Sequence, residues 1–180
     1  MADRQPPVVT DMAPPLAGVT LEYLIDEFSP SIYRVAVSIV RDRSLAEDVV
    51  QETLIKAWQG LPGFRGESPL RGWVLRIAHN TAISMLRKRR DDVRDPFTMP
   101  ERDGEISLER EVAGKAMLDE LWVALDRLDE TSRTMIVLRE LEGMSYEDIS
   151  AAMRLPLPTV KTRLFRARKS LANALEGWNV

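Results

Sequence analysis

Apolar residues recur at helical spacing in nearly every long segment of this 180-residue chain. The stripe near the start consists of Leu21, Leu24, Ile25 and Phe28. Comparable stripes run through 32–40, 46–58, 70–85, 118–125 and 149–175. This three-to-four-residue period is typical of helices with one buried face. No segment alternates apolar and polar residues between hairpin signals, so no strand is expected. The sequence therefore predicts an all-α protein.

Helix-terminating signals divide the chain into two small helical domains. The proline-containing residues 1–19 are predicted to be a disordered tail, and 20–92 to form the first domain. Residues 93–112 form an acidic flexible linker, and 113–176 form a second domain that ends in a helix-turn-helix. Within these domains, Ser29-Pro30 is expected to interrupt or restart a helix.

Further signals predict where individual helices begin and end. Ser44 with Glu47, and Ser145 with Asp148, have the spacing of capping boxes. Gly143 is expected just after the end of a helix, as a C′ residue. Three features mark remaining helix boundaries: Thr20 as an N-cap, Ser68-Pro69 as a helix start, and Pro158 in a first turn.

Charge is distributed very unevenly, although the formal net charge is only −3. Residues 61–94 hold eight basic and three acidic side chains, a balance of +5. Residues 95–111 hold six acidic and two basic ones, a balance of −4, and 149–175 hold six basic and no acidic ones. Two basic modules with an acidic connector favour a partner that carries phosphates.

Several classes of function are excluded or disfavoured. The chain has no cysteine, which rules out disulfides, zinc–thiolate sites and thiol catalysis. It has no apolar run long enough to span a membrane and no signal peptide, so no membrane insertion and a cytoplasmic location are expected. It shows no glycine-rich phosphate loop, no metal-ligand set and no nucleophile with a base. We therefore expect no cofactor, no metal and no enzymatic activity.

The most specific motif is the pair of short helices between Ser145 and Lys169. Val160, Leu164, Ala167, Leu171 and Leu175 are predicted to point inward. Lys161, Thr162, Phe165, Arg166 and Lys169 are left to point outward. A helix with a cationic outer face fits the major groove of DNA. The alternative is a basic, solvated helix in a small bundle.

A second basic region combines aromatic and polar side chains near a loop. Phe64, Trp73, His79 and Asn80 lie among arginines, a mixture suited to unstacked, single-stranded bases. The signal is weak, because Trp73 falls on the apolar stripe and is expected in the core. His79 has no partner carboxylate or metal set, and we interpret it as solvated or facing the backbone.

An acidic face is predicted on the helix that follows Ser44. Glu47, Asp48, Gln51 and Glu52 share the side opposite its apolar stripe. Such a face is usually solvated, but it could also dock a basic helix.

These motifs, taken together and in order, resemble a known family. Residues 42–53, 64–66 and 73–82 are similar to conserved region 2 of bacterial sigma-70-family RNA polymerase sigma factors. Residues 143–149 and 156–168 are similar to region 4. A chain with only these two regions resembles the extracytoplasmic-function group, and the resemblance covers about 20–176.

The resemblance implies an alternative-sigma initiation factor that directs core RNA polymerase to promoters and aids strand opening. Its partners would be the β′ clamp and β flap of core polymerase, promoter DNA that is duplex at −35 and single-stranded at −10, and an anti-sigma factor, which could hold it at the membrane. The acidic linker would thread toward the active-site and RNA-exit path. The runner-up is a helix-turn-helix regulator that binds duplex operator DNA as a dimer.

The resemblance also assigns residues to each contact. Core polymerase would bind Asp48, Gln51 and Glu52. The −10 element would bind Phe64, Arg65, Gly66, Glu67, Ser68, Arg76 and Asn80. The −35 element would bind Pro158, Thr159, Lys161, Thr162, Arg163, Phe165 and Arg166. The chain departs from the family pattern at two places. Leu128-Asp129 stands where the family commonly has Leu-Pro, and Pro158 stands where the family usually has a small residue before the recognition helix.

Overall fold

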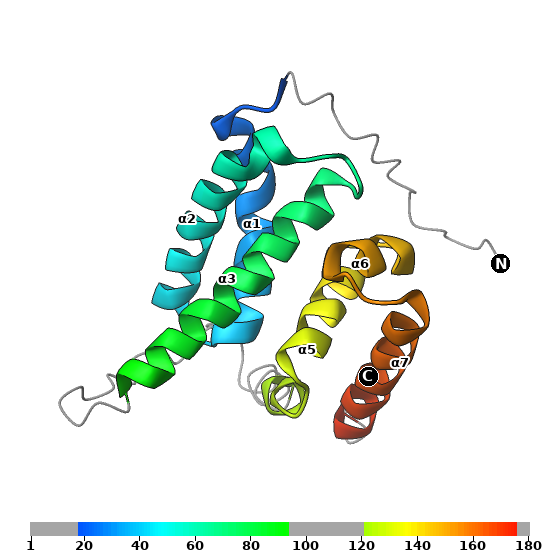
Figure 1. Ribbon diagram of the computed structural model, residues 1–180. Coiled ribbons are helices and arrows are strands. Elements are labelled where there is room, and N and C mark those ends of the chain that lie inside the picture. Colours follow the sequence, from blue (N-terminus) through cyan, green and yellow to red (C-terminus); the bar gives the residue numbers. More distant parts are fainter. Residues whose placement is uncertain (1–17, 94–120, 176–180) are drawn as a thin grey trace.

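A computed structural model describes residues 18–93 and 121–175, and every regular element within those ranges is helical (Figure 1). The predicted tail lies outside the described residues up to position 17, as does the linker from position 94. The helices are α1 (Leu21–Val40), α2 (Arg43–Gly60), η2 (Leu61–Gly63), α3 (Leu70–Val93), α5 (Glu130–Ile136), η3 (Val137–Leu141), α6 (Tyr146–Met153) and α7 (Leu157–Leu175). Residues 121–126 are also helical.

Helices α1, α2 and α3 pack on one another and form the N-terminal module, residues 18–93 (Figure 1). Leu24, Ile32, Val49 and Val74 are completely buried between them. The predicted stripes explain this packing, with one exception. Ile25 is 42% exposed, although the sequence placed it on the inward face.

Helix α1 continues through Pro30, so the predicted interruption at Ser29-Pro30 was wrong. Proline removes the amide donor that would bond to the carbonyl of Asp26. Asp26 lies on the exposed side of α1, where water can take that role. The Ser29 hydroxyl donates to the carbonyl oxygen of Ile25 at 2.6 Å, which adds a bond at the same turn.

The start of α2 also differs from the prediction. Its N-cap is Asp42, whose Oδ1 accepts a 2.8 Å hydrogen bond from the amide of Leu45. Ser44 lies inside the helix, so the predicted Ser44–Glu47 capping box was wrong. Both residues can cap, but Asp42 also meets Arg89 of α3, a tertiary partner that spacing does not reveal.

The C-terminal module, residues 121–175, contains α5, η3, α6 and α7 (Figure 1). The predicted cap of α6 is confirmed, because Ser145 Oγ accepts from the amide of Asp148 at 3.0 Å and donates to its carboxylate at 2.7 Å. Gly143 has φ +66°, as a C′ residue after η3 requires. Asp129 caps α5 by accepting from the amide of Ser132. The unusual Leu128-Asp129 pair therefore supplies a helix cap.

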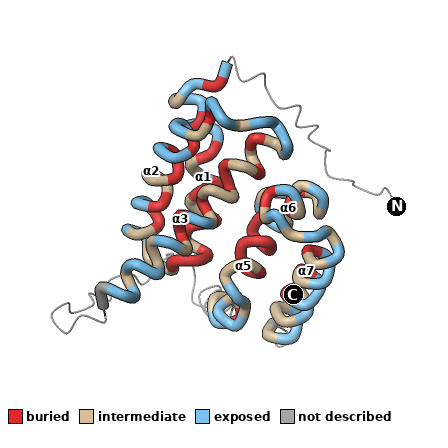
Figure 2. Tube along the Cα trace, in the orientation of Figure 1, coloured by how far each residue is buried: buried red, intermediate tan, exposed pale blue. Residues whose placement is uncertain are grey.

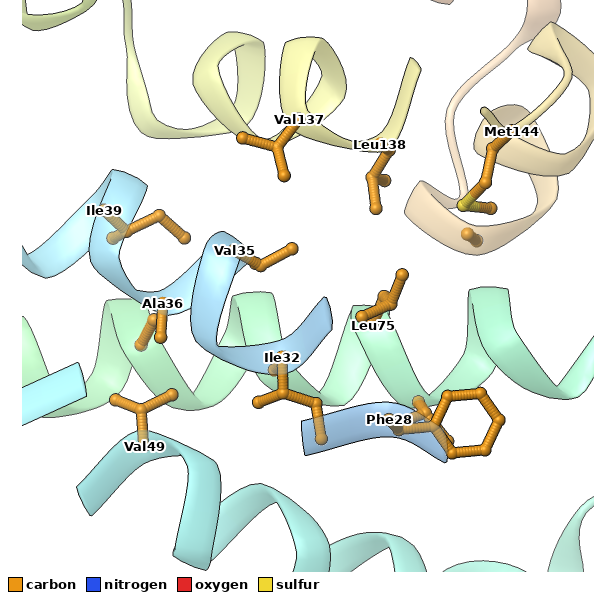
Figure 3. Close-up of a cluster of buried hydrophobic side chains, with 14 of the residues drawn as sticks. Phe28, Ile32, Val35, Ala36, Ile39, Val49, Leu75, Val137, Leu138 and Met144 are labelled. Carbon is orange, nitrogen blue, oxygen red and sulfur yellow. The ribbon is translucent and has the colours of Figure 1, made fainter. Parts of the chain in front are cut away.

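The two modules share one continuous hydrophobic core. Figure 2 shows buried residues on both sides of the boundary between α3 and the α5–α6 pair. Figure 3 shows Val137 and Leu138 of η3 directed toward α1 and toward Leu75 of α3. We call this boundary the seam. The sequence predicted two modules but gave no indication of how they pack.

Candidate nucleic-acid and protein interfaces

Helix α7 presents a cationic outer face. Its inward residues Val160, Leu164 and Ala167 are buried, as predicted. The residues predicted to point outward are all exposed: Lys161, Thr162, Phe165, Arg166 and Lys169. Phe165 is 68% exposed, which is unusual for an aromatic side chain. This face can meet the edges of bases and the phosphates beside them.

The turn that leads into α7 is fixed by local hydrogen bonds. Arg154 adopts a left-handed conformation, with φ +53°, directly after α6. The Ser150 hydroxyl donates to the carbonyl of Leu155 at 2.6 Å, and the amide of Leu155 donates back to the carbonyl of Ser150. These bonds close the tight turn between α6 and α7, the two helices of the predicted helix-turn-helix.

Two arginines of α7 already have partners within the C-terminal module. Arg163 Nη1 bonds the carboxylate of Asp129 at 3.1 Å. Burial would raise the pKa of Asp129, but hydrogen bonds from Ser132 and the nearby Arg163 outweigh it and lower that pKa. Arg168 pairs with Glu140 and donates to the hydroxyl of Tyr146. Lys161, Arg166 and Lys169 form no such ion pairs within the described structure, so they are the cations best placed for an external partner.

The loop between η2 and α3 is built on an aromatic pair. Phe64 lies 5.1 Å from Trp73 between ring centroids. A side chain at Gly60 would meet the Trp73 ring at 3.2 Å, which fixes Trp73 against α2. Beyond Phe64, the exposed Gly66 has φ +69°, so glycine suits this sharp turn.

An open pocket lies between this loop and α6. Its N-terminal wall includes Phe64, Arg65, Glu67, Ser68 and Arg76. Its opposite wall comes from the helix-turn-helix: Ser150, Ala151, Arg154 and Leu155. Burial and the nearby charge of Arg154 lower the pKa of Arg76, and Glu67 opposes that shift. Three arginines (Arg65, Arg76 and Arg154) against the single Glu67 give the lining of the pocket a net positive charge.

A second open groove continues along α3. It is lined on one side by Asn80, Arg87 and Arg90, and on the other by Glu130 and Thr131 of the C-terminal module. His79 lies at its base, and its Nδ1 is 2.8 Å from the hydroxyl oxygen of Thr134. Since that hydroxyl donates to the carbonyl of Glu130, it accepts from His79. The interpretation of His79 as solvated or facing the backbone was therefore wrong.

Helix α2 carries a face of mixed character. Asp48 and Gln51 are exposed, and Glu52 pairs with Lys56 at 3.1 Å. On the same side Ile55 and Trp58 are 51% and 44% exposed. Neither Ile55 nor Trp58 was among the residues predicted for this face. The spacing Gln51–Ile55–Trp58 was the available signal, because it places all three on one side of a helix.

In the described part of the chain, no cluster of three or more histidine, aspartate or glutamate side chains could hold a metal ion. Nor is any helix there long and apolar enough to cross a membrane. The interfaces above are thus built from helix faces, one loop and the open pockets beside them.

Comparison with known proteins identifies the family of this chain. Residues 24–91 match Sigma-70 region 2, and residues 118–171 match Sigma-70 region 4. The chain belongs to the sigma-70 family. It is 38% identical over 165 residues to the RNA polymerase sigma-H factor of Pseudomonas aeruginosa, covering 86% of each chain. It is also 38% identical over 139 residues to the ECF RNA polymerase sigma-E factor of Escherichia coli K12, covering 72% of this chain and 73% of that one.

Solved structures show the same fold. The sigma factor RpoE in complex with the anti-sigma factor NepR, from Bartonella quintana, has a TM-score of 0.66 and 29% identity, with 86% of this chain and 96% of that chain covered. CnrH in complex with the cytosolic domain of CnrY has a TM-score of 0.66 and 26% identity, with 91% and 94% covered. This chain is an extracytoplasmic-function sigma factor that directs RNA polymerase to promoters.

In this sigma factor the residues expected at −10 gather around one pocket, and those expected at −35 lie along α7. Asn80 lies further along α3, in a pocket that also includes Arg76. Arg154, which lies opposite Arg76, was absent from both predicted sets. Only the packing of the two modules brings it there, so no sequence signal could have found it.

Proposed function

We propose that this sigma factor divides promoter recognition between its modules. Helix α7 would read the −35 element as duplex, through the predicted set Pro158, Thr159, Lys161, Thr162, Arg163, Phe165 and Arg166. The loop pocket would hold single-stranded −10 DNA, through Phe64, Arg65, Gly66, Glu67, Ser68, Arg76 and Asn80. The observation that carries this proposal is the exposed face of α7, where Phe165 and three cations without ion pairs in the described structure (Lys161, Arg166 and Lys169) face solvent.

Core polymerase would bind the outer face of α2. Asp48, Gln51 and Glu52 supply its polar part, and the exposed Ile55 and Trp58 add apolar area. Exposed aromatic residues beside charges are typical of binding hot spots. The C-terminal module would contact the β flap.

The factor would act in the cytoplasm and would itself make and break no covalent bonds. We also propose an anti-sigma partner for it. Its similarity to two sigma factors solved with such partners supports that proposal.

Run-off transcription with purified core polymerase tests the −35 assignment. Arg166→Ala should lower −35-dependent initiation by roughly 5- to 150-fold, the equivalent of about 1–3 kcal/mol for a good base contact. Arg163→Ala should lower it less, because Asp129 already binds that guanidinium. Arg127→Ala, which removes an exposed cation outside α7, serves as the control. Unchanged run-off with Arg166→Ala would refute the assignment.

Co-elution with core polymerase tests the α2 face. The double variant Asp48→Lys/Glu52→Lys should lose association while its circular dichroism spectrum stays that of the parent, because neither side chain is buried. The matched control is Glu22→Lys/Asp26→Lys, an exposed pair with the same spacing on α1. Equal retention of core polymerase by both double variants would contradict the proposal.

A further inference from the structure

Two arginines lie on opposite flanks of the outer face of α7. The helix runs along the side of the C-terminal module away from α3, so its outer face is open (Figure 1). At about 100° per residue, Arg163 and Arg168 each lie roughly a quarter to a third of a turn from the centre of the outward residues, one on either side. Their side chains are 40% and 41% exposed.

The major groove of DNA would bring phosphates to both flanks. It is about 12 Å wide, close to the diameter of about 10–12 Å of a helix with its side chains. When the outer face of α7 meets base edges, the phosphates on the two rims of the groove approach Arg163 and Arg168. A free guanidinium at either position would bind such a phosphate through charge-assisted hydrogen bonds.

Both guanidinium groups, however, are held by carboxylates of the same module. Arg163 Nη1 donates to the two oxygens of Asp129 at 3.1 and 3.2 Å. On the other flank, Arg168 donates to Glu140 Oε1 from Nε at 2.8 Å and lies within 2.6 Å of it through Nη2. The side chains of Asp129 and Glu140 are 54% and 47% exposed, so both ion pairs lie where a rim phosphate would approach.

Neither carboxylate needs its charge to hold the fold. Asp129 caps α5 by accepting from the amide of Ser132 at 3.0 Å, and asparagine caps helices as well as aspartate does. An ion pair as exposed as Glu140–Arg168 contributes little to stability. The two negative charges therefore act mainly on the arginines beside them.

The charges of α7 are thus sorted by position. The cations of the outer face, Lys161, Arg166 and Lys169, form no ion pairs in the described structure, whereas the flanking arginines are neutralised. Contacts to phosphates supply the affinity for DNA of any sequence, and contacts to base edges supply the preference for one sequence. An arginine that must leave a carboxylate gains less from a phosphate, and the carboxylate then repels that phosphate.

We propose that Asp129 and Glu140 are specificity-determining residues of promoter recognition. They compete with DNA phosphates for Arg163 and Arg168, and they lower the affinity of α7 for duplex DNA of any sequence. The base contacts of the outer face are left to decide where the factor binds, since specificity is a difference between affinities. This inference rests on the proposed function, because that function places α7 on duplex DNA.

Neutral substitutions in the full-length protein test the competition. Asp129→Asn/Glu140→Gln keeps the size of both side chains and the cap of α5, and it frees both arginines. Its affinity for a short fluorescent duplex of random sequence is measured by anisotropy over a range of salt concentrations. We expect roughly tenfold tighter binding than for the parent, and a plot of log affinity against log salt that steepens by about 1.8, or 0.9 for each new phosphate contact.

Two controls separate this effect from a change in net charge. Glu130→Gln/Glu147→Gln removes two charges from the same module, and neither residue forms an ion pair in the described structure. It should leave the salt dependence unchanged. In an Arg163→Gln/Arg168→Gln background, Asp129→Asn/Glu140→Gln should have no effect on the salt dependence, because no arginine is left to free.

Promoter selection gives the second readout. In run-off transcription with core polymerase, added random-sequence DNA should inhibit Asp129→Asn/Glu140→Gln at about a tenth of the concentration that inhibits the parent. Loss of the cap alone would not produce this sensitivity, because it adds no contact to DNA.

Three outcomes would overturn the inference. Unchanged affinity and salt dependence would mean that the ion pairs only brace the module. Weaker binding would mean that the carboxylates position the arginines for DNA. An equal gain in Glu130→Gln/Glu147→Gln would mean that net charge alone matters. The proposed function fails separately, if Arg166→Ala leaves run-off unchanged, whatever the random duplex shows.

Discussion

Two arginines of α7 differ in their surroundings in a way that their spacing does not reveal. Arg163 and Arg166 look equivalent in the sequence, since both are cations on the same helix. In the structure Arg163 turns toward Asp129, whereas Arg166 is exposed. Spacing of about 100° per residue predicts a side of the helix, but it does not predict which neighbour a long side chain reaches. The −35 set was therefore predictable as a face, and the ranking of its members was not.

His79, the only histidine of the chain, should make stability depend on pH. Burial lowers its pKa from the ordinary value near 6.5, and the charges of Glu130 and Asp129 oppose that shift. Between the lowered and the ordinary pKa, the unfolded chain binds more protons than the folded chain. The free energy of unfolding should therefore fall as pH drops below about 6.5, by at most about 1.4 kcal/mol per pH unit.

Urea denaturation at pH 7.5 and pH 5.5 measures this effect. In His79→Gln the difference between the two pH values should disappear, because carboxyl groups titrate mostly below that window. A pH dependence of the same size in His79→Gln would assign it to other groups.

The helices themselves were largely predictable from the sequence. Their stripes, the cap at Ser145 and the turn at Gly143 depend on neighbours within about four positions. The errors arose where tertiary contacts or solvent exposure decide the helix boundary. Asp42, which also pairs with Arg89, is the N-cap of α2 in place of Ser44. Helix α1 continues through Pro30 because, on its exposed side, the missing proline amide leaves a carbonyl that water can reach.

The cap of α2 gives a test at the scale of the element. Asp42→Ala should destabilise the chain by about 0.5–2 kcal/mol, because the amide of Leu45 loses its acceptor and Arg89 loses its partner. Ser44→Ala should change stability by less than about 0.5 kcal/mol, since Ser44 is exposed inside the helix. Chemical denaturation of both variants makes the comparison. A larger loss for Ser44→Ala would show that the helix begins at the predicted position.

At the scale of the whole molecule, the seam is the feature that sequence reasoning could not reach. The boundary joins residues more than a hundred positions apart, such as Ser31 and Glu142. Glu142 in sequence is one acidic residue after a short apolar helix, a pattern typical of a solvated end. Only the packing of Val137, Leu138 and Met144 on the N-terminal module buries it (Figure 3).

A core that continues across the seam should make the modules unfold together. In scanning calorimetry we expect one transition for the parent chain, because separating the modules would expose Leu138 and Leu75, both fully buried. Glu142→Ala should split that transition in two. It leaves Arg34 without its carboxylate partner and Arg71 with only a 3.7 Å contact to Glu27. The cost should be roughly 2–4 kcal/mol, less than for fully buried pairs, because these arginine side chains are 39% and 28% exposed.

The neighbouring carboxylate separates this effect from a general loss of charge. Glu140→Ala removes an exposed ion pair within the C-terminal module and should cost less than about 1 kcal/mol, with a single transition retained. Two transitions in the parent chain would mean that the modules fold independently and that the seam adds little to stability. A single transition in the parent chain, in Glu142→Ala and in Glu140→Ala would mean that apolar packing alone couples the modules. The ion pairs of Glu142 would then add nothing to that coupling.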